Sequence, residues 1–313
     1  MRPTQTAVSL LDGRIVPTMD VHVPWDAPGF RQGYGLFETI RVASGRAFLG
    51  GLHAQRITDA APSMGIEPWL NARSLTRALD RLVRVSAIRD GAMRLYLMPG
   101  APPPGEEMTE ETPATRNDPS PGPDDAEQGR QARYAGATPA RARYIGQIVP
   151  GRPRVPEAAR AVLSPDLRDP AGPLVGLKTI SYAAERLLLA QARLRGADEA
   201  LRRNLAGRIA EGTRSNLFLI EENRLVTPPL SEGLLAGVTR WFLLGIAAEN
   251  GLQPAEEPVA VERLQEADEA FLASTLRGVV PLVELGGRPI GSRRPGPKTV
   301  MLRAVLERHI ARG

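Results

Sequence analysis

The stretch Pro99 to Arg130 limits, more than any other, what this chain can fold into. It contains three consecutive prolines from Pro102, several adjacent pairs of acidic residues and almost no large apolar residue. A segment of this composition cannot bury enough apolar surface to offset the entropy cost of ordering it. We therefore predict that residues 99–130 are a disordered surface insertion, and that the core is built by the residues on either side.

On the N-terminal side of the insertion, short strands alternate with helices. The pattern predicts a hairpin over residues 6–17 that turns at Asp12-Gly13, and further strands at 36–42, 47–49 and 93–98. It predicts a helix from Leu52 that Pro62 ends, and a second helix capped by Asn71. Gly33-Tyr34-Gly35 lacks the spacing of a dinucleotide-binding loop and predicts a tight bend.

After the insertion, a strand at 140–149 leads to Pro150-Gly151-Arg152-Pro153, which is typical of a linker. Beyond it we expect strands at 199–203, 208–210, 216–220, 225–227, 270–273 and 282–285, and helices at 182–195, 240–249 and 299–312. The first of these helices has Leu187, Ala190 and Leu194 as its apolar stripe. Many antiparallel hairpins and few parallel crossovers predict the α+β class, with one domain over 1–150 and another over 151–313.

The composition excludes several kinds of site. Cysteine is absent, which excludes disulfides, thiolate nucleophiles and cysteine metal sites. The three histidines, His22, His53 and His309, are too scattered to hold a metal, so we predict none. The chain has no signal-like apolar start and no apolar run of about 18 residues. We expect a cytoplasmic protein with no membrane partner.

The positive charge of the chain does not predict a nucleic-acid partner. The net charge is +5 and the sequence pI is about 10.0, but the arginines are dispersed among 35 acidic residues. Aromatic residues make up only 4% of the chain, and no basic block is interleaved with them. A bias toward arginine explains the charge more simply than a nucleic-acid surface does.

Lys178 is exceptional because the chain otherwise uses arginine for its positive charges. Of 40 basic residues, only Lys178 and Lys298 are lysines, and Lys298 lies in a polar stretch typical of the surface. Lys178 lies among apolar residues, where a charge is costly. A buried lysine amine can lose its proton and attack a carbonyl, which arginine cannot do. By itself, the stretch also fits a lysine whose ammonium group reaches water.

Three other stretches contain candidate functional groups. Glu211 opens Glu-Gly-Thr-Arg-Ser-Asn-Leu-Phe between two strands, and is either a turn residue or the partner of a buried cation. The loop from residue 234 runs into a helix, which either binds a phosphate at its N-terminus or is simply capped by Thr239. Ser274 and Thr275 follow a strand and alone indicate little.

Together, these groups are the ones that pyridoxal phosphate needs. A lysine forms the Schiff base, a carboxylate keeps the pyridine nitrogen protonated, and a helix N-terminus holds the phosphate. We therefore predict pyridoxal 5′-phosphate as the cofactor and a small amino compound as the substrate.

The order and spacing of the motifs resemble the class IV aminotransferases, the fold-type IV pyridoxal-phosphate enzymes. This family includes branched-chain and D-amino-acid transaminases and 4-amino-4-deoxychorismate lyase. The resemblance covers nearly the whole chain except residues 99–130. It rests on eight short motifs, which begin at Gly35, His53, Gly176, Gly196, Glu211, Thr227, Leu235 and Ala267.

The resemblance implies a small N-terminal α/β domain and a larger C-terminal domain with the site between them, usually in a homodimer. It implies that Lys178 is the Schiff-base lysine and proton shuttle, that Glu211 pairs with the pyridine nitrogen, and that Tyr182 binds the phenolic oxygen. The implied phosphate ligands and ring contact are Arg56, Val238, Thr239, Thr275 and Leu235. The candidate substrate residues are Tyr34, Phe37 and Arg94, of which Arg94 either meets a carboxylate or is a satisfied strand arginine.

Two reactions of the family stay open. A transaminase passes an amino group to 2-oxoglutarate, whereas the lyase releases pyruvate from 4-amino-4-deoxychorismate and leaves 4-aminobenzoate, a folate precursor. Ser274-Thr275-Leu276 stands where branched-chain enzymes have Gly-Thr-Ala, and Pro-Gly-Ala-Pro-Pro-Pro follows the 93–98 strand where D-amino-acid enzymes have Arg-x-His. The resemblance therefore favours the lyase, with a branched-chain or D-amino-acid transaminase as the alternative. A third hypothesis is a non-catalytic binding protein on the same fold.

Overall fold

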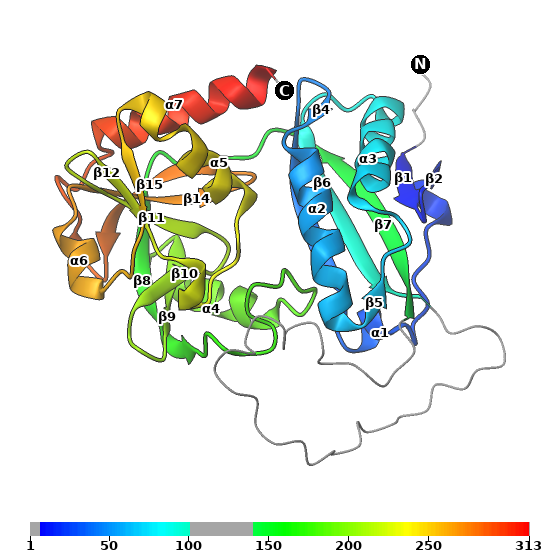
Figure 1. Ribbon diagram of the computed structural model, residues 1–313, viewed down its shortest axis with the longest axis horizontal. Helices are drawn as coiled ribbons and strands as arrows, with labels where there is room; N and C mark the ends of the chain where they lie inside the picture. The colour runs from blue at the N-terminus through cyan, green and yellow to red at the C-terminus, as the bar shows by residue number, and fades with distance from the viewer. Residues whose placement is uncertain (1–6, 101–139, 313) are drawn as a thin grey trace, which may run out of the picture.

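Two β-sheets, each with its own hydrophobic core, dominate the structure (Figure 1). The computed structural model describes residues 7–100 and 140–312. The sheets form two lobes that lie side by side, and the chain passes from the first sheet to the second after residue 150. The predicted α+β class and two-domain arrangement are confirmed.

The N-terminal sheet has the strand order β2-β1-β7-β6-β3-β4, with β5 paired to β7. Its strands are β1 (Val8–Leu11), β2 (Arg14–Pro17), β3 (Leu36–Ala43), β4 (Arg46–Ala47), β5 (Ile66–Glu67), β6 (Gly91–Pro99) and β7 (Ala140–Pro150). Its helices are α1 (Pro28–Arg31), α2 (Gly50–Ala60) and α3 (Ala72–Ser86), with single 3₁₀ turns at Thr18–Asp20 and Ala61–Met64. Helices α2 and α3 lie across one face of this sheet (Figure 1).

The two faces of β3 differ because successive side chains of a strand point to opposite sides. Leu36, Glu38 and Ile40 are buried, with Glu38 bonded to side chains of α2. Phe37 and Thr39 are only half-buried and line a cavity on the opposite side. Strand β3 therefore connects the core of the N-terminal lobe with the candidate site.

The C-terminal sheet has the order β10-β9-β8-β15-β14-β11-β12-β13, with β16 paired to β15. Its strands are β8 (Ala159–Arg168), β9 (Glu199–Asn204), β10 (Ile209–Gly212), β11 (Asn216–Glu221), β12 (Arg224–Thr227), β13 (Gln253–Glu256), β14 (Glu269–Ser274), β15 (Gly278–Leu285) and β16 (Arg288–Pro289). Because β10 also pairs with β11, six of these strands form a closed ring. Around them lie α4 (Ala183–Leu194), α5 (Val238–Ile246), α6 (Val261–Glu266) and α7 (Pro297–Arg312), with 3₁₀ turns at Leu230–Glu232 and Ala248–Asn250.

Most predicted elements are present, and several boundaries differ. Asn71 caps α3 as predicted, since its Oδ1 accepts a bond from the Ser74 amide at 2.9 Å. The strand predicted at 47–49 is only β4, because Leu49 has a φ of 53° and is the N-cap of α2. Helix α2 ends before Pro62, which lies in a 3₁₀ turn. The second sheet also has more parallel pairing than expected, because β8 is parallel to both of its neighbours.

The predicted apolar stripe of α4 is wrong. Leu187 is 65% exposed and Leu194 is 89% exposed, whereas Leu188, Leu189 and Ala192 are buried. Both sets of residues have helical spacing, so periodicity alone does not decide between them. The packing of α4 on β8 and β9 selects the second set.

The predicted domain limits at residues 150 and 151 stay a prediction. Strand β7 ends at Pro150, and β8, the first strand of the second sheet, begins at Ala159. Most of the predicted 99–130 insertion lies outside the described residues, but Pro99 belongs to β6 and pairs with Ala142, so an insertion starting at 99 begins too early. In the described parts of the chain, no helix is long and apolar enough to cross a membrane.

Candidate active site

Side chains from both lobes line one cavity of about 970 Å³. Ten of the eleven residues proposed from the sequence lie on its wall: Phe37, Arg56, Arg94, Lys178, Tyr182, Glu211, Leu235, Val238, Thr239 and Thr275. These residues are far apart in the sequence, so the fold brings together the groups that the motifs had indicated separately.

Tyr34 is the residue that the fold does not bring to this wall. Its hydroxyl donates a hydrogen bond to the carbonyl of Met64, and its ring packs against the N-terminal core. The neighbouring glycines explain the motif in which it lies. A Cβ on Gly35 would come within 2.7 Å of the Leu97 carbonyl oxygen, so only glycine fits there.

The backbone around Lys178 is bound to the start of β3. The Phe37 amide donates to the Lys178 carbonyl at 2.8 Å, and the Ile180 amide donates to the Gly35 carbonyl at 2.9 Å. This short antiparallel contact attaches a segment of the C-terminal half to the N-terminal sheet. It holds the Lys178 backbone at the junction of the two lobes.

The amine of Lys178 lies inside the cavity, 4.5 Å from the centroid of the Phe37 ring. Burial lowers the pKa of Lys178, while the nearby carboxylates of Glu38 and Glu211 act in the opposite direction and Arg56 lowers it further. Of the two alternatives left by the sequence, this position favours the reactive amine, because desolvation makes the neutral form easier to reach.

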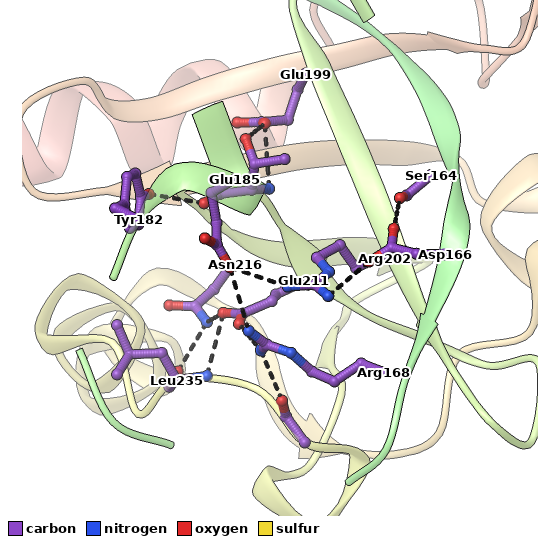
Figure 2. Close-up of polar contacts among 12 residues, drawn as sticks. Ser164, Asp166, Arg168, Tyr182, Glu185, Glu199, Arg202, Glu211, Asn216 and Leu235 are labelled. Atoms are coloured by element: carbon purple, nitrogen blue, oxygen red, sulfur yellow. Dashed lines mark hydrogen bonds and ion pairs between the residues drawn. The ribbon is translucent and has the colours of Figure 1, made fainter. Parts of the chain in front are cut away.

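Glu211 is held by a dense set of hydrogen bonds (Figure 2). Its Oε2 accepts from the Leu235 amide at 3.1 Å and from Asn216 Nδ2 at 3.4 Å, and its Oε1 accepts from Arg168 Nη1. Asn216 Nδ2 also donates to the Leu235 carbonyl at 2.9 Å. Of the two alternatives for Glu211, this geometry supports the partner of a buried cation.

Arg168 is a functional candidate that the sequence reasoning missed. Burial raises the pKa of Glu211, and the Arg168 charge and the Leu235 amide oppose that rise. Arg168 Nη1 also donates a hydrogen bond to the Gly233 carbonyl at 2.9 Å, which helps to hold the guanidinium group in place. Arg168 comes ten positions before Lys178 in a strand rich in charge, and nothing in its local sequence distinguishes it from the other arginines.

Glu38 is a second missed residue, although it lies inside the motif that begins at Gly35. Its carboxylate accepts two bonds from Arg56, at 2.7 and 2.8 Å, and lies 2.7 Å from His53 Nδ1. Burial alone would raise the pKa of Glu38, but the charges of Arg56 and His53 and their hydrogen bonds outweigh it and lower the pKa to about 2. The carboxylate therefore stays ionised and fixes the direction of Arg56.

The N-terminus of α5 lies beside Arg56. Arg56 Nη1 donates to the Ala236 carbonyl at 2.7 Å, and the next residue, Gly237, is the N-cap of the helix. Thr239 is therefore not the N-cap, and no side chain caps this helix end. A Cβ on Gly237 would lie 1.9 Å from Asn216 Oδ1, so glycine allows the loop to pack against Asn216.

Tyr182 and Phe37 form an aromatic wall beside Lys178. Their rings make an edge-to-face contact with centroids 5.5 Å apart, and the Tyr182 hydroxyl donates to the Thr213 carbonyl at 2.8 Å. Burial raises the pKa of Tyr182, so its hydroxyl stays protonated at neutral pH. Thr275 and Leu276 also line the cavity, from the turn between β14 and β15.

This set of groups fits pyridoxal phosphate. The cavity offers an amine of lowered pKa, a buried carboxylate held by an arginine, and an uncapped helix end next to Arg56. Free N–H groups at a helix N-terminus and a guanidinium are suited to a phosphate, and a fixed carboxylate is suited to a protonated ring nitrogen. Among the described residues, no group of three potential metal ligands was found.

Comparison with known proteins supports the same interpretation. The Amino-transferase class IV profile matches residues 35–285. A D-alanine aminotransferase of Bacillus licheniformis is 27% identical over 302 residues, which are 96% of each chain. Among solved structures, a branched-chain aminotransferase of Thermoproteus uzoniensis has a TM-score of 0.81 at 25% identity, over 97% of this chain and 95% of that one. A putative 4-amino-4-deoxychorismate lyase of Legionella pneumophila has a TM-score of 0.77 at 25% identity, over 93% and 97%.

These similarities extend over nearly the whole of each chain, and the profile includes both the Lys178 and the Glu211 segments. The predicted family, enzyme class and cofactor are thereby confirmed. The chain belongs to the class IV aminotransferase family, whose members are transaminases and lyases that depend on pyridoxal phosphate.

Proposed function

We propose that Lys178 binds the cofactor covalently and also moves the proton in the reaction. The observation that supports this most directly is that Lys178, Glu211 and the uncapped end of α5 line a single cavity. In this proposal, Glu211 pairs with the ring nitrogen and Leu235 packs on the ring. Tyr182 binds the phenolic oxygen, and the phosphate is held by Arg56, Val238, Thr239 and Thr275.

Bound pyridoxal phosphate supplies a carbonyl for the substrate amine and a ring that accepts electrons when a C–H bond breaks. The protein residues supply the acid–base chemistry. Once Lys178 is released as a free amine, its Nζ takes the proton from the substrate carbon and later returns it to another atom. Burial lowers the pKa of Lys178, which favours the neutral form that this step needs.

We propose the release of 4-aminobenzoate and pyruvate from 4-amino-4-deoxychorismate as the reaction. Leu276 lines the cavity in a turn where branched-chain transaminases have a smaller Gly-Thr-Ala sequence. Strand β6 ends at Pro99 without the Arg-x-His sequence that D-amino-acid transaminases have there. Arg94, on the N-terminal wall, has no carboxylate partner among the described residues and is suited to a substrate carboxylate.

Amino-acid transamination is the second candidate. It is favoured by the similarity to the D-alanine aminotransferase of Bacillus licheniformis, which covers 96% of both chains.

We further propose that the chain acts as a homodimer in the cytoplasm. A homodimer would cover exposed apolar side chains such as those of Trp25 and Phe30.

The test of the cofactor site is the visible absorbance of the purified protein. We expect a band from the bound cofactor that is lost in Lys178→Ala, with Lys298→Ala as the matched control. A colourless protein that takes up no added pyridoxal phosphate would instead support the non-catalytic binding protein.

The test of the reaction is incubation with enzymatically made 4-amino-4-deoxychorismate. We expect 4-aminobenzoate and pyruvate in equal amounts, and loss of both in Lys178→Ala. If neither forms, and the protein transfers the amino group of leucine or D-alanine to 2-oxoglutarate, then the transaminase is the correct assignment.

A further inference from the structure

A row of alternating charges runs from Glu211 to the surface of the protein (Figure 2). Arg168 Nη1 donates to Glu211, and Arg168 Nη2 lies 3.8 Å from Glu185 Oε1. The same Glu185 oxygen accepts from Arg202 Nη1 at 3.0 Å, and Arg202 Nη2 donates to Asp166 Oδ2 at 2.8 Å. The side chain of Asp166 is 41% exposed, so the row begins in the cavity and ends at solvent.

Arg168 lies between two carboxylates, whereas a comparable arginine of the cavity has one. Arg277 Nη2 donates to Glu199 Oε2 at 3.1 Å, and no second acid pairs with Arg277 among the described residues. Glu211 contacts one terminal nitrogen of Arg168, and Glu185 faces the other. Because a guanidinium group is planar and rigid, anions at both terminal nitrogens fix the direction in which it points.

Glu185 is itself held in place. It lies in the first turn of α4, lines the cavity, and has a side chain that is only 15% exposed. Arg202 connects it to Asp166, which also accepts from the Ser164 hydroxyl. Arg202 Nε is buried without a partner among the described residues. Since an unpaired buried donor is costly, the two carboxylates that Arg202 contacts are what keep it in this orientation.

An acid in the first turn of a helix also has a simpler role, because it interacts favourably with the helix dipole. That role needs only a negative charge near the start of α4. It does not need the 3.0 Å bond from Arg202 or the position of Glu185 beside Arg168. These contacts indicate a second role, in which the exact place of the carboxylate matters.

We propose that Glu185 is a positioning residue, which acts through Arg168 to keep Glu211 ionised. The inference rests on the proposed function, in which Glu211 pairs with the ring nitrogen of the cofactor. Arg168 stabilises the ionised carboxylate most strongly while its Nη1 stays within hydrogen-bond distance. Glu185, held by Arg202, keeps Arg168 in that place from the other side.

The direction of a pKa shift separates this role from a simple charge effect. If Glu185 acts only as a nearby negative charge, its removal favours the ionised form of Glu211 and lowers the pKa of Glu211. If Glu185 positions Arg168, its removal leaves burial less opposed, and the pKa of Glu211 rises. Lys178 and the Leu235 amide also face Glu211 and stay in place in both cases.

Two other groups that face Glu185 respond to its charge. Burial lowers the pKa of Lys178, and the charge of Glu185 opposes that shift. Burial, followed by the charge of Glu185, raises the pKa of Tyr182. A variant that keeps the charge of Glu185 but moves the carboxylate leaves both effects largely unchanged, and so isolates the contact with Arg168.

The test is titration of the apoprotein with pyridoxal phosphate at a series of pH values, with binding followed by visible absorbance. We expect Glu185→Ala to raise the Kd at neutral pH by about threefold or more. The loss of affinity on acidification should move to higher pH. Glu185→Asp, which keeps the charge on a side chain one methylene shorter, should move it in the same direction. Glu262→Ala is the matched control, because Glu262 is an exposed acid in the first turn of α6.

The double variant Glu185→Ala with Arg168→Met shows whether Glu185 acts through Arg168. Its pH dependence should equal that of Arg168→Met alone, because the residue that transmits the effect is gone. A further shift in the double variant overturns the inference.

Glu185→Asp decides the question if Glu185→Ala does not fold, since it keeps an acid at the start of α4. Wild-type pH dependence in Glu185→Asp, or a shift to lower pH in Glu185→Ala, overturns the positioning role and leaves the proposed cofactor site intact. A wild type that binds no pyridoxal phosphate overturns the proposed function, and this inference with it.

Discussion

The pKa values of Lys178 and Glu211 shift in opposite directions for the same reason. Burial disfavours the charged form of both groups, so the pKa of Lys178 falls and that of Glu211 rises. The two groups then have different needs. In the proposed function, a neutral Lys178 acts as the base, whereas Glu211 stays ionised to pair with a protonated ring nitrogen. The positive charge of Arg168 favours the ionised form of Glu211.

We predict that Arg168→Met raises the pKa of Glu211 further. Loss of the adjacent charge leaves burial less opposed, so the carboxylate takes up its proton at a higher pH. The acid limb of the profile of kcat/KM against pH should therefore move to higher pH. Arg168→Lys, which keeps the charge, should move the limb less. An acid limb at the same pH in Arg168→Met would contradict this role.

At the level of elements, Glu38 ties β3 to α2. Its carboxylate binds Arg56 and His53, which are three residues apart on α2 and share a face of the helix. The same contact directs Arg56 toward the start of α5, which belongs to the other lobe. A single buried carboxylate thus joins a strand, a helix and the proposed phosphate site.

We predict that Glu38→Gln lowers the free energy of unfolding by about 3–5 kcal/mol at neutral pH, because it leaves a buried cation without its counter-charge. The pKa of Glu38 is about 2 in the folded protein, against an ordinary value of 4.5. The stabilisation is therefore present above pH 4.5 and is lost as the pH falls through about 2.

Urea unfolding of both proteins across this pH range measures the effect. The difference between wild type and Glu38→Gln should shrink as the pH falls. Glu67→Gln, an exposed residue of β5, serves as the control. A difference that does not depend on pH would contradict the assignment of the stabilisation to the ionised Glu38.

The start of α5 should also be sensitive to substitution, because Gly237 packs tightly against Asn216. We predict that Gly237→Ala displaces the loop, since the added Cβ would lie 1.9 Å from Asn216 Oδ1. Overpacking of this kind costs about 1–3 kcal/mol. The melting temperature should fall, and the Kd for pyridoxal phosphate should rise. Gly245→Ala, in the same helix and with open space around it, should neither lower the melting temperature nor raise the Kd.

At the scale of the whole molecule, the described chain exposes several large apolar side chains. Trp25 is 77% exposed and Phe30 is 69% exposed, and both lie in the segment that precedes β3. Exposed aromatic residues of this kind are typical of surfaces that bind a partner. The end of the same segment contacts the Lys178 region, since Ser181 Oγ donates to the Gly33 carbonyl at 3.0 Å.

We predict that Trp25→Ser combined with Phe30→Ser weakens self-association of the protein. Sedimentation velocity should show a dimer for the wild type and a shift toward monomer for the double variant. Leu205→Ser, at a residue that is 63% exposed on the other lobe, should leave the dimer intact. A wild type that sediments as a monomer at every concentration would refute the proposed homodimer.

Elements with strong local signals could be predicted from the sequence. The Asp12-Gly13 turn, the Asn71 cap and the alternation in β3 and β6 depend on interactions within a few residues. The predicted stripe of α4 was wrong because two faces of that helix have equally apolar sequences, and only the sheet beneath selects one. Residues outside a recognisable motif, such as Arg168, gave no local signal at all.

The family and the cofactor could be predicted from the sequence alone, because they depend on residue types in a particular order and spacing of motifs, which can be read without coordinates. Which charged side chains pair with one another could be seen only in the folded structure. Arg168 and Glu211 are 43 positions apart, Arg277 and Glu199 are 78 apart, and all four are identical in type to many residues on the surface. Electrostatic pairing depends on distance and burial in space, so it becomes visible only when the strands that hold these residues are brought together.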